Sequence, residues 1–336
     1  MPLTIAIKAL NERDRIAETL RHAVAAAHLC GGEVLLADSG SQDGTIEIAR
    51  QFPIRIVQLA RPEDRCCGAG AQLAFQEARG RYFYLLDGDM LLDPAFLPAA
   101  IAFLESHPEV AGVGGELREQ VVVNQEFAIR AQAASRLRPE GETVGNLDGG
   151  GLYRRSAIES VGYFADRNLR AFEELDLGWR LRCAGWTLAR IPVHAVDHFG
   201  HAISGYSLLW RRLRSGYAGG AGQVVRAALG KPWLPGLLRS FGHIRNSLIV
   251  LGWWCLLLAL LVVGGFWPWG VILLVLPLGF LLARRRSFSL ALYTFLSWNG
   301  IALATIGGFL RSRTAPTVPL AVRELADAPP LRAEQG

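Results

Sequence analysis

The stretch Tyr82–Pro94, YFYLLDGDMLLDP, decides how the first half of the chain is interpreted. A mostly apolar run ends in two aspartates, Asp87 and Asp89, separated by one glycine, and the chain then becomes apolar again. Buried carboxylates are costly unless they are paired or bind a cation. Two carboxylates around a glycine can converge on one hard divalent ion, which also binds phosphate oxygens. The alternative is an Asp-Gly turn at a strand end, which is common and which the dipeptide alone favours.

Strand and helix patterns alternate along the first 200 residues. Strands are expected at 3–7, 33–37, 54–59 and 81–86, with helical patterns at 16–27, 43–52, 70–78 and 94–106. This alternation predicts an α/β fold with a doubly wound, mostly parallel sheet. Ligands of such sheets bind at the carboxyl ends of the strands. Asp38 and Asp87 both follow strands, so we expect them to line one crevice.

The charges are divided unevenly between two regions of the chain. Residues 1–197 contain 21 Lys/Arg and 27 Asp/Glu, whereas residues 198–323 contain 13 Lys/Arg and no Asp or Glu. The second region also holds two uncharged apolar runs, 247–283 and 287–310. A helix needs about 20 apolar residues to cross a bilayer, so the first run predicts two crossings and the second predicts one. A buried core helix is the alternative, but such helices rarely stay uncharged for so long.

Topology follows from the flanking charges. The N-terminus lacks the pattern of a signal peptide, so the front domain is expected in the cytoplasm and the chain in the cell (inner) membrane as a multi-pass protein. Basic clusters at 206–245 and 284–286 belong inside, as a two-helix hairpin would place them. A third crossing would put Arg311 and Arg313 outside, which is unfavourable. The five cysteines lack zinc-type spacing, and a reduced cytosolic setting fits them.

Three further segments carry polar or small residues where a substrate could bind. LADSGSQDGT (36–45) is a strand, a loop of small residues and a helix start, which suits a nucleotide or an ordinary βα loop equally well. NLDGGGLYRRSAI (146–158) has three glycines that allow close approach of a substrate to the backbone. The segment 172–201 begins with acids at a helix start and ends in a strand with His198. Those acids can simply complement the helix dipole, and Asp176 can pair with Arg180 four residues later.

In this order, the segments resemble the family 2 inverting glycosyltransferases, which have the GT-A fold, over about residues 3–200. AIKALNE (6–12) is similar to the family's opening strand and Asn-Glu turn, although Lys8 and Leu10 stand where Pro and Tyr are usual. DSGSQDGT resembles its nucleotide loop, LLDGDM its metal-binding motif, and GGGLYRR its acceptor-side loop. EELDLGWRLRCAGW resembles its Glu-Asp motif with an Arg-bearing helix, and IPVHAVDH the strand whose final His reaches the metal in some members.

The resemblance implies a role for each matching residue. It makes Glu174 the general base, with Asp176 as a rival because Glu is one methylene longer than the usual Asp. It implies Mg²⁺ or Mn²⁺ at Asp87, Asp89 and His198. The implied substrate contacts are Asn11, Glu12, Asp38 for the base or ribose, Arg65 as the nearest substitute for a phosphate contact, Asp87, and Asp148 and Gly150 on the acceptor side.

The resemblance extends loosely beyond residue 200. Processive members carry a Gln-x-x-Arg-Trp motif on an interfacial helix. Here RRLRS (211–215) lies at about that distance, which makes Arg211 and Arg214 candidate substrate contacts. Ser215 replaces the Trp, and this argues against a processive polymerase.

The expected organisation has four parts. Residues 1–205 form the GT-A glycosyltransferase domain and residues 206–245 form basic interfacial or juxtamembrane helices. Residues 246–310 form about three transmembrane helices and residues 311–336, rich in Pro and Ala, form a disordered tail. Aromatic and Arg residues alternate in 206–220, which suits a helix on an anionic membrane surface or a basic linker.

The implied function is metal-assisted sugar transfer with inversion. The donor is a nucleotide-diphosphate-sugar, and the acceptor is a hydroxyl or phosphate of a lipid-linked or envelope glycan; nucleic acid is not expected as a partner. A sugar nucleotidyltransferase is an alternative, but KALNERDR has no glycine after the first strand. A dinucleotide oxidoreductase is weaker, since GAGAQL lacks the third glycine. A catalytically inactive membrane scaffold is a further alternative.

Overall fold

The computed structural model describes residues 1–120, 141–147, 149, 151–200, 205–263 and 268–326. The chain forms two compact units. The first unit comprises Met1–Ala202 together with Arg313–Gly336, and the second comprises Ile203–Ser312.

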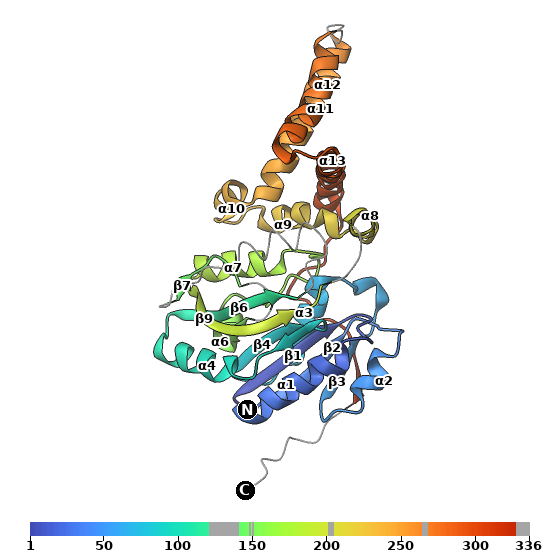
Figure 1. Cartoon of the computed structure of the whole chain (residues 1–336). Helices are drawn as coiled ribbons and strands as arrows, with labels where there is room; N and C mark the ends of the chain where they lie inside the picture. The colour runs from blue at the N-terminus through green and yellow to red at the C-terminus, as the bar shows by residue number, and fades with distance from the viewer. Residues whose placement is uncertain (121–140, 148, 150, 201–204, 264–267, 327–336) are drawn as a thin grey trace. The chain divides into compact units, whose positions relative to one another are not determined.

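The first unit is built on a ten-stranded sheet with a hydrophobic core on each face (Figure 1). The strand order is β10-β3-β2-β1-β4-β8-β6-β9-β5, and β7 pairs with β9. The strands are β1 (Leu3–Ala9), β2 (Glu33–Asp38), β3 (Arg55–Leu59), β4 (Tyr82–Asp87), β5 (Met90–Leu92), β6 (Val110–Glu119), β7 (Glu142–Thr143), β8 (Leu152–Arg154), β9 (Thr187–His198) and β10 (Val322–Ala326). The helices are α1 (Ile16–Cys30), α2 (Thr45–Ala49), the 3₁₀ turn η1 (Pro62–Asp64), α3 (Cys67–Glu77), α4 (Phe96–Ser106), α6 (Arg155–Ser160) and α7 (Glu173–Cys183).

The predicted α/β fold and its first four strands are confirmed, but the prediction of a mostly parallel sheet is wrong. Strands β3, β2, β1 and β4 are parallel neighbours, and β6 is parallel to β9. The pairs β4–β8, β6–β8, β5–β9, β7–β9 and β10–β3 are antiparallel. A parallel pair needs a crossover of a dozen or more residues. Strand β8 lies between β4 and β6 and is antiparallel to both, and the edge strands β5 and β10 are antiparallel to their neighbours, so the sheet is mixed.

Strand register brings the polar ends of three strands together. Lys8 in β1 lies between Ala37 of β2 and Asp87 of β4, and Ala9 lies beside Asp38. Asp38 and Asp87 therefore flank the carboxyl end of β1, as the alternation of strands and helices predicts.

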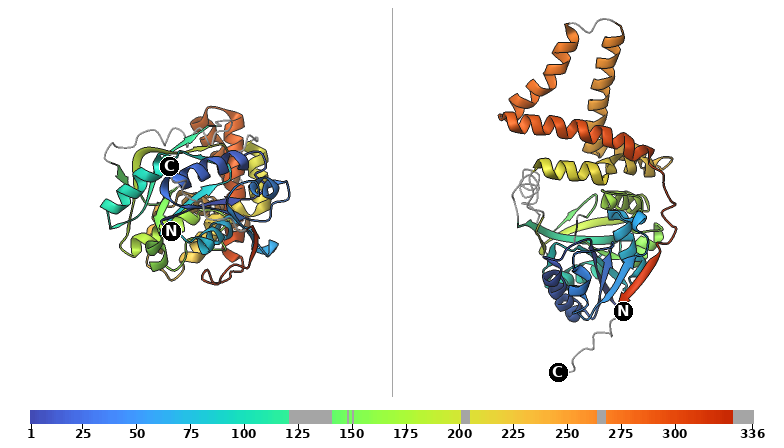
Figure 2. Two further views of the ribbon diagram at one scale, coloured as in Figure 1. Left: turned by 90° about the horizontal axis from the view of Figure 1, so that it is seen from below. Right: turned by 90° about the vertical axis from the view of Figure 1, so that its right-hand side faces the viewer.

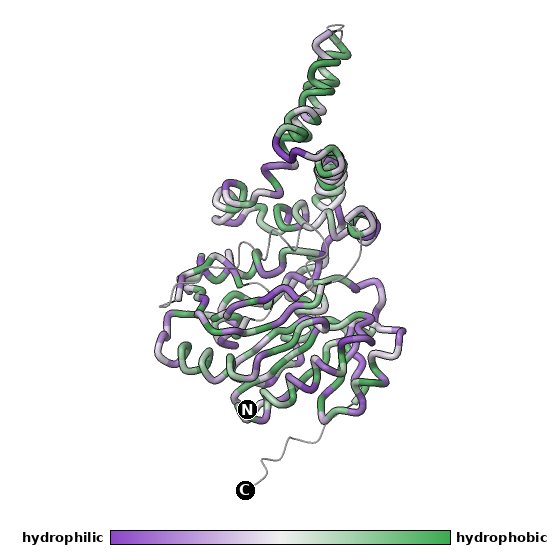
Figure 3. Tube along the Cα trace, viewed as in Figure 1, coloured by the Kyte–Doolittle hydropathy of each residue, from purple (hydrophilic) through white to green (hydrophobic). Residues whose placement is uncertain are grey.

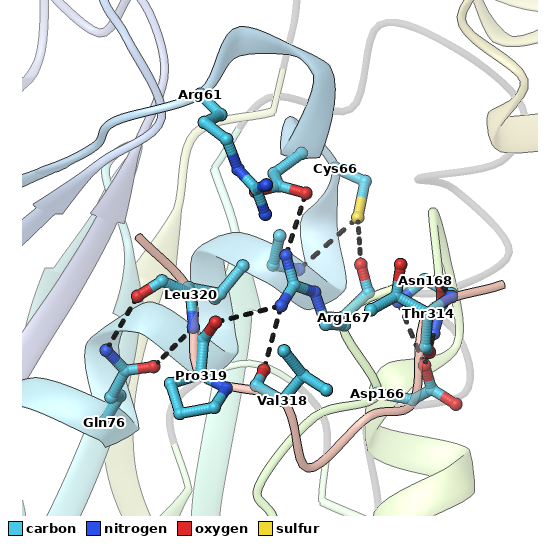
Figure 4. Close-up of polar contacts among 12 residues, drawn as sticks. Arg61, Cys66, Gln76, Asp166, Arg167, Asn168, Thr314, Val318, Pro319 and Leu320 are labelled. Atoms are coloured by element: carbon cyan, nitrogen blue, oxygen red, sulfur yellow. Dashed lines mark hydrogen bonds and ion pairs between the residues drawn. The ribbon is translucent and has the colours of Figure 1, made fainter. Parts of the chain in front are cut away.

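The C-terminal segment joins this sheet. The sequence predicts a disordered tail from residue 311, whereas the structure places Val322–Ala326 in the edge strand β10, antiparallel to β3 (Figure 2). Before β10, Leu320 is buried and exchanges hydrogen bonds with the Gln76 side chain (Figure 4). An edge strand offers unpaired backbone groups to any segment that reaches it. The composition of the tail could not reveal that β3 would pair with it. Residues 327–336 lie outside the described ranges.

The second unit is helical. It comprises α8 (Gly205–Ser215), the 3₁₀ turn η2 (Tyr217–Gly219), α9 (Gly220–Ala228), α10 (Leu234–Ser240), α11 (Gly242–Val262), α12 (Trp269–Arg285) and α13 (Phe288–Leu310). Two of these, α11 and α13, are long and apolar enough to cross a membrane by length and composition. Figure 3 shows that α11 and α12 are coloured hydrophobic over most of their length. Helix α12 has 17 residues among those described and contains Pro277, so it is shorter than α11 and α13.

Candidate functional site

The Asp-Gly-Asp turn after β4 places Asp89 beside His198. Strand β5 pairs antiparallel with the end of β9, with Met90 opposite His198. Asp89 Oδ2 lies 3.6 Å from His198 Nε2. On the other side of β9, strand β6 places Glu119 opposite His198, and Glu119 Oε2 lies 2.6 Å from the histidine Nδ1. Three strands thus hold one imidazole between two carboxylates.

This environment controls the charge of the imidazole. Burial lowers the pKa of His198, but the Asp89 and Glu119 carboxylates outweigh it and raise the pKa to about 9. The Glu119 side chain is itself almost fully buried, with 2% of its surface exposed. A carboxylate bound to one ring nitrogen fixes the direction in which the other nitrogen points. Glu119 therefore orients His198 Nε2 toward Asp89.

This pair suits a divalent cation. An aspartate oxygen and an imidazole nitrogen are common ligands of Mn²⁺-type ions, and the carboxylate behind the histidine is the usual outer partner of a metal-binding His. Within the ranges that the structure describes, no three His, Cys, Asp or Glu residues are gathered into a ready-made metal site. Asp89 and His198 therefore fit an ion whose remaining ligands come from a phosphate group and water.

A partly buried lysine lies next to this pair. Lys8 Nζ is 3.2 Å from Asp87 Oδ1 and 3.1 Å from Glu173 Oε1. Burial lowers the pKa of Lys8, but Asp87 and Glu173 more than offset this, and the pKa is well above its usual value. The ammonium is thus a fixed internal cation. It already engages Asp87, so Asp89 is the better placed of the two aspartates to bind a metal.

Helix α7 begins with the acids that the sequence singles out. Its first residue is preceded by Phe172, which has a φ of 67°. A bulky residue in the left-handed region is strained, and such strain gathers at functional sites. Burial and the neighbouring Glu173 raise the pKa of Glu174 to about 8, although Lys8 partly counteracts them. A carboxyl group with this pKa can take up a proton near neutral pH, which suits a general base.

Asp176, the rival base, has a different environment. Its Oδ2 accepts a hydrogen bond from Arg180 Nε at 2.8 Å, and both side chains are buried. The guanidinium also donates to the backbone carbonyls of Tyr163 at 2.6 Å and Phe164 at 2.8 Å. This ion pair ties α7 to the segment before it. The geometry therefore favours Glu174 over Asp176 as the residue that meets a substrate.

Asp38 is the last residue of β2, and its side chain is fully buried. Oδ2 accepts hydrogen bonds from the backbone N–H groups of Gly40 (2.7 Å) and Ser41 (2.9 Å) and from Gln58 Nε2 (2.7 Å). Oδ1 accepts one from the Ser41 hydroxyl. The sequence predicts a carboxylate free to contact a base or ribose. The structure shows one whose two oxygens already shape the loop.

Arg65 binds the same loop. Its Nε donates to Ser39 O at 2.7 Å and its Nη2 to Gly40 O at 2.9 Å. Gly40 has a φ of 95°, a conformation that favours glycine. The guanidinium predicted to contact a phosphate therefore supports the loop backbone here.

The Asn-Glu turn after β1 clamps this loop from the other side. Asn11 has a φ of 59°; its backbone N–H donates to Ser41 Oγ at 2.8 Å and its Oδ1 accepts from Gln42 N at 2.9 Å. The Glu12 N–H donates to Thr45 Oγ1 at 2.9 Å. Glu12 also packs on Gly88, where an added Cβ would lie 2.6 Å from its Cγ. The two predicted substrate residues thus join the β2 loop to the Asp-Gly-Asp turn.

The remaining predicted residues are not brought to this edge by the described structure. Asp148 and Gly150 lie outside the described ranges. Their neighbour Gly149 lies against Met90, because an added Cβ would be 2.6 Å from the Met90 Cε. Arg211 and Arg214 are exposed on α8, in the second unit.

Sequence reasoning missed Lys8, Glu173 and Glu119 as members of the site. Lys8 could have been found, because a lysine near the end of the apolar strand LTIAIKA needs an acidic partner. Glu173 is 165 residues away from it, and Glu119 is 79 residues from His198. No local pattern links residues at such separations.

Residues 4–162 match the sequence model of Glycosyl transferase family 2. The Bacillus subtilis protein named Putative glycosyltransferase EpsE is 30% identical over 162 residues, which cover 44% of this chain and 55% of that protein. The N-acetylglucosaminyl-diphospho-decaprenol L-rhamnosyltransferase of Mycobacterium tuberculosis is 26% identical over 209 residues, which cover 49% of this chain and 66% of that protein. The alignment thus covers less than two thirds of either relative.

The structure resembles that of the mannosyltransferase PcManGT from Pyrobaculum calidifontis in complex with GDP-Man and Mn²⁺. The TM-score is 0.60, and the alignment covers 92% of this chain and 86% of that chain at 20% identity. A likeness at this identity shows the fold alone. With the mixed sheet, it gives the first unit a GT-A-like fold.

Proposed function

Since residues 4–162 match the sequence model of Glycosyl transferase family 2, we propose that the protein is a membrane-bound, inverting and metal-assisted glycosyltransferase. It moves a sugar from a nucleotide-diphosphate-sugar to a hydroxyl or phosphate of a lipid-linked or envelope-glycan acceptor. One observation carries this proposal. Asp87, Glu173 and Glu174 lie around the single ammonium of Lys8, beside the Asp89–His198 pair, at the edge of the sheet where α/β folds bind ligands.

The leaving group is assigned to the Asp89 side of this edge. Asp89 and His198, with Asp87 in support, would hold Mg²⁺ or Mn²⁺. When bound, such an ion neutralises the charge that develops on the departing nucleoside diphosphate. The presence of Mn²⁺ with GDP-Man in the PcManGT structure supports this assignment. Glu119 acts through His198 by keeping its Nε2 turned toward Asp89.

Glu174 is assigned to the acceptor. Its carboxylate accepts the proton of the acceptor hydroxyl while the hydroxyl oxygen attacks the anomeric carbon from the face opposite the diphosphate, which inverts that centre. Lys8 neutralises Asp87 and Glu173 nearby, so that Glu174 can still ionise among acids. A positioned base of this kind contributes about 10²–10⁴-fold in rate.

The nucleotide is assigned to the loop after β2. Asp38 and Arg65 hold the backbone of this loop, to which the base and ribose would bind, and Asn11 and Glu12 fix it to the neighbouring turn. Asp148 and Gly150 are proposed as acceptor contacts, on the evidence of the GGGLYRR motif alone.

The acceptor is proposed to be lipid-linked. The relative from Mycobacterium tuberculosis carries a diphospho-decaprenol in its name. The present chain has exposed aromatic and arginine side chains on α8, among them Trp210, Arg211 and Arg214, which suit a surface of anionic lipid. Arg211 and Arg214 would contact the acceptor's phosphates. The proposed location is the cell (inner) membrane, with the catalytic unit on the cytoplasmic side.

The test is a panel of nucleotide-sugars incubated with membranes that contain the full-length protein. The proposal predicts transfer of one labelled sugar to a lipid-extractable product, with Mn²⁺ or Mg²⁺ required and no product from Glu174→Gln membranes. Release of pyrophosphate from a sugar phosphate and a nucleoside triphosphate would instead indicate the nucleotidyltransferase. The inactive scaffold predicts neither transfer nor hydrolysis with any donor, and that result would overturn the proposal.

A further inference from the structure

The segment after the last apolar helix is anchored in the catalytic unit. Arg313 forms an ion pair with the fully buried Asp166. Arg167, whose side chain is 2% exposed, donates from Nη1 to the carbonyls of Val318 at 2.8 Å and Pro319 at 3.1 Å (Figure 4). Strand β10 then pairs with β3. These contacts lie within one unit, so residues 313–326 are on the same side of any bilayer as the catalytic sheet.

A constraint on topology follows. The helical unit leaves the catalytic unit after residue 202 and returns to it at residue 313. A chain that starts and ends on one side of a bilayer crosses it an even number of times. Three crossings would put β10 and β3 on opposite sides, so at least one of the three apolar helices does not cross.

The charges indicate which helices cross. Helices α11 and α12 form a hairpin, in which Trp253 Nε1 donates to Leu273 O at 2.8 Å. Their 21 and 17 residues span about 31 and 26 Å, close to the hydrocarbon thickness of about 30 Å. The hairpin ends in the exposed arginines 284–286. Positive residues stay on the cytoplasmic side, so the chain is back on that side when α13 begins.

Helix α13 lies along α8 and α9 from Tyr293 to Phe309. Near its start the Tyr293 and Tyr206 rings are 5.2 Å apart, and near its end the Arg226 guanidinium lies 5.4 Å from the Phe309 ring centroid. Between them, an added Cβ at Gly222 would collide with the Thr305 carbonyl oxygen. Figure 2 shows α13 running across the foot of the α11–α12 hairpin.

Helices packed side by side share one depth in the membrane. Arg211, Arg214 and Arg226 are exposed on α8 and α9. Arginines in the hydrocarbon core are costly, and arginine-bearing amphipathic helices lie in the interface. Because α13 packs along the helices that carry these arginines from Tyr293 to Phe309, the same position at the interface is expected for it.

The two faces of α13 fit that position. The face toward the other helices consists of small side chains: Ala291, Thr294, Ala302, Thr305 and Gly308. The outer face has large apolar side chains that are 41–71% exposed: Leu296, Leu303, Ile306 and Leu310. An interfacial helix buries such a face in the boundary between headgroups and acyl chains.

We propose that α8, α9 and α13 form a platform on the bilayer surface that faces the cytoplasm, and that, of these helices and α11 and α12, only the α11–α12 hairpin crosses the bilayer. The partner of the platform is a lipid surface with anionic headgroups, which the arginines contact. The inference rests on the proposed membrane association but is independent of the proposed sugar transfer. With two crossings, Arg311 and Arg313 lie on the cytoplasmic side, which positively charged residues favour.

Cysteine labelling in sealed vesicles tests the proposal. The parent protein is the full-length chain with the exposed Cys183 and Cys255 replaced by Ser and Ala. Single cysteines replace four exposed residues: Arg50 in the catalytic unit, Val263 at the hairpin tip, Ser289 at the start of α13 and Thr317 after it. A membrane-impermeant maleimide is applied to right-side-out and inverted vesicles, with the parent as the background.

The expected result is that Val263→Cys reacts only in right-side-out vesicles. Ser289→Cys and Thr317→Cys react only in inverted vesicles, as the reference Arg50→Cys does. Thr317→Cys on the side opposite to Arg50→Cys would show an odd number of crossings. Ser289→Cys on the side of Val263→Cys would show that α13 crosses, and Val263→Cys on the side of Arg50→Cys would show that nothing crosses. Each of these three results overturns the proposal.

Two further measurements keep the result decisive. Sugar transfer is assayed in the same vesicles, so predicted labelling without transfer would count against the proposed function and leave the topology standing. If the cysteine variants fail to accumulate, reporters are fused to residue 336 of the unmodified full-length chain. If the C-terminus is cytoplasmic, the green fluorescent protein fusion should fluoresce and the alkaline phosphatase fusion should be inactive. An active phosphatase would overturn the proposal.

Discussion

The loop after β2 and the start of α7 both bury acids at the carboxyl edge of the same sheet, but they neutralise them differently. Asp38 accepts four hydrogen bonds from its own loop and from Gln58. At the start of α7, Glu173 and Glu174 share the ammonium of Lys8 with Asp87. The first arrangement is complete without a ligand. The second has more negative charge than its one lysine balances, and the pKa values of Asp87 and Glu174 are raised by burial.

The two arrangements therefore have different capacities to bind a cation or a proton. A carboxylate whose oxygens already accept hydrogen bonds from the protein stabilises the fold. A substrate would add little further stabilisation to it. An acid cluster with too few positive charges is stabilised when a cation binds to it or when an acceptor gives it a proton. Substitutions at Asp38 should therefore mainly reduce stability, whereas substitutions at Glu174 should mainly reduce kcat.

The largest effect is expected for Glu174→Gln. It keeps the shape of the side chain but removes the group that accepts the proton, so kcat should fall by about 10²–10⁴-fold. Binding of UDP or GDP with Mn²⁺, measured by calorimetry, should stay within a few-fold of the parent. A variant that keeps near-normal turnover would exclude Glu174 as the base.

Asp176→Asn is the matched control, two residues along the same helix. It breaks a buried ion pair, a change that costs about 3–5 kcal/mol of stability. Urea unfolding should show this loss, whereas kcat of the folded fraction at low temperature should change little. A loss of kcat as large as that of Glu174→Gln, without loss of stability, would exchange the two assignments.

Glu119→Gln tests the support of His198. Outer partners of metal-binding histidines typically contribute about 10–100-fold in metal affinity. We expect the Mn²⁺ concentration for half-maximal nucleotide binding to rise by this factor, with unchanged binding at saturating Mn²⁺. If nucleotide binding by the variant is weaker than that of the parent by the same factor at all Mn²⁺ concentrations, Glu119 does not act through the metal.

Asp38→Asn should have a smaller and mainly structural effect. An amide group replaces one acceptor oxygen and leaves buried donors unpaired, which costs about 1–3 kcal/mol. Thermal unfolding should show this loss, and the KM for the donor should rise while kcat is retained. An unchanged melting temperature with a large fall in kcat would place Asp38 among the reacting groups.

The sequence could predict part of this site but not all of it. Strands that alternate with helices, and the acids that follow two of them, were enough to place Asp38 and Asp87 at one edge. The partners of those acids were not predictable, because they come from other parts of the chain, as Glu173 does for Lys8. The tail is a similar case, since strand β10 is ordered by the open edge of β3 and not by its own composition.

The pH dependence is the subtlest of the expected effects. The pKa of Glu174 in the folded protein is about 8, above its ordinary 4.5, so the folded state favours the protonated form. Its contribution to stability is present below about pH 4.5 and is lost progressively as the pH rises toward 8. Glu174→Gln should therefore stabilise the protein relative to the parent at pH 8 and not at pH 5, by thermal unfolding. The parent's kcat/KM should rise up to about pH 8, and a flat profile would contradict this assignment.

Calorimetry can test whether Asp89 and His198 bind a divalent ion together with a diphosphate. UDP and GDP are titrated into the parent, Asp89→Ala and the surface control Glu63→Ala, each with Mn²⁺ and with a chelator. The account predicts that Mn²⁺ strengthens binding of one of the two nucleotides to the parent and to Glu63→Ala, and that Asp89→Ala loses this gain. Equal binding with Mn²⁺ and with chelator in all three proteins would contradict it.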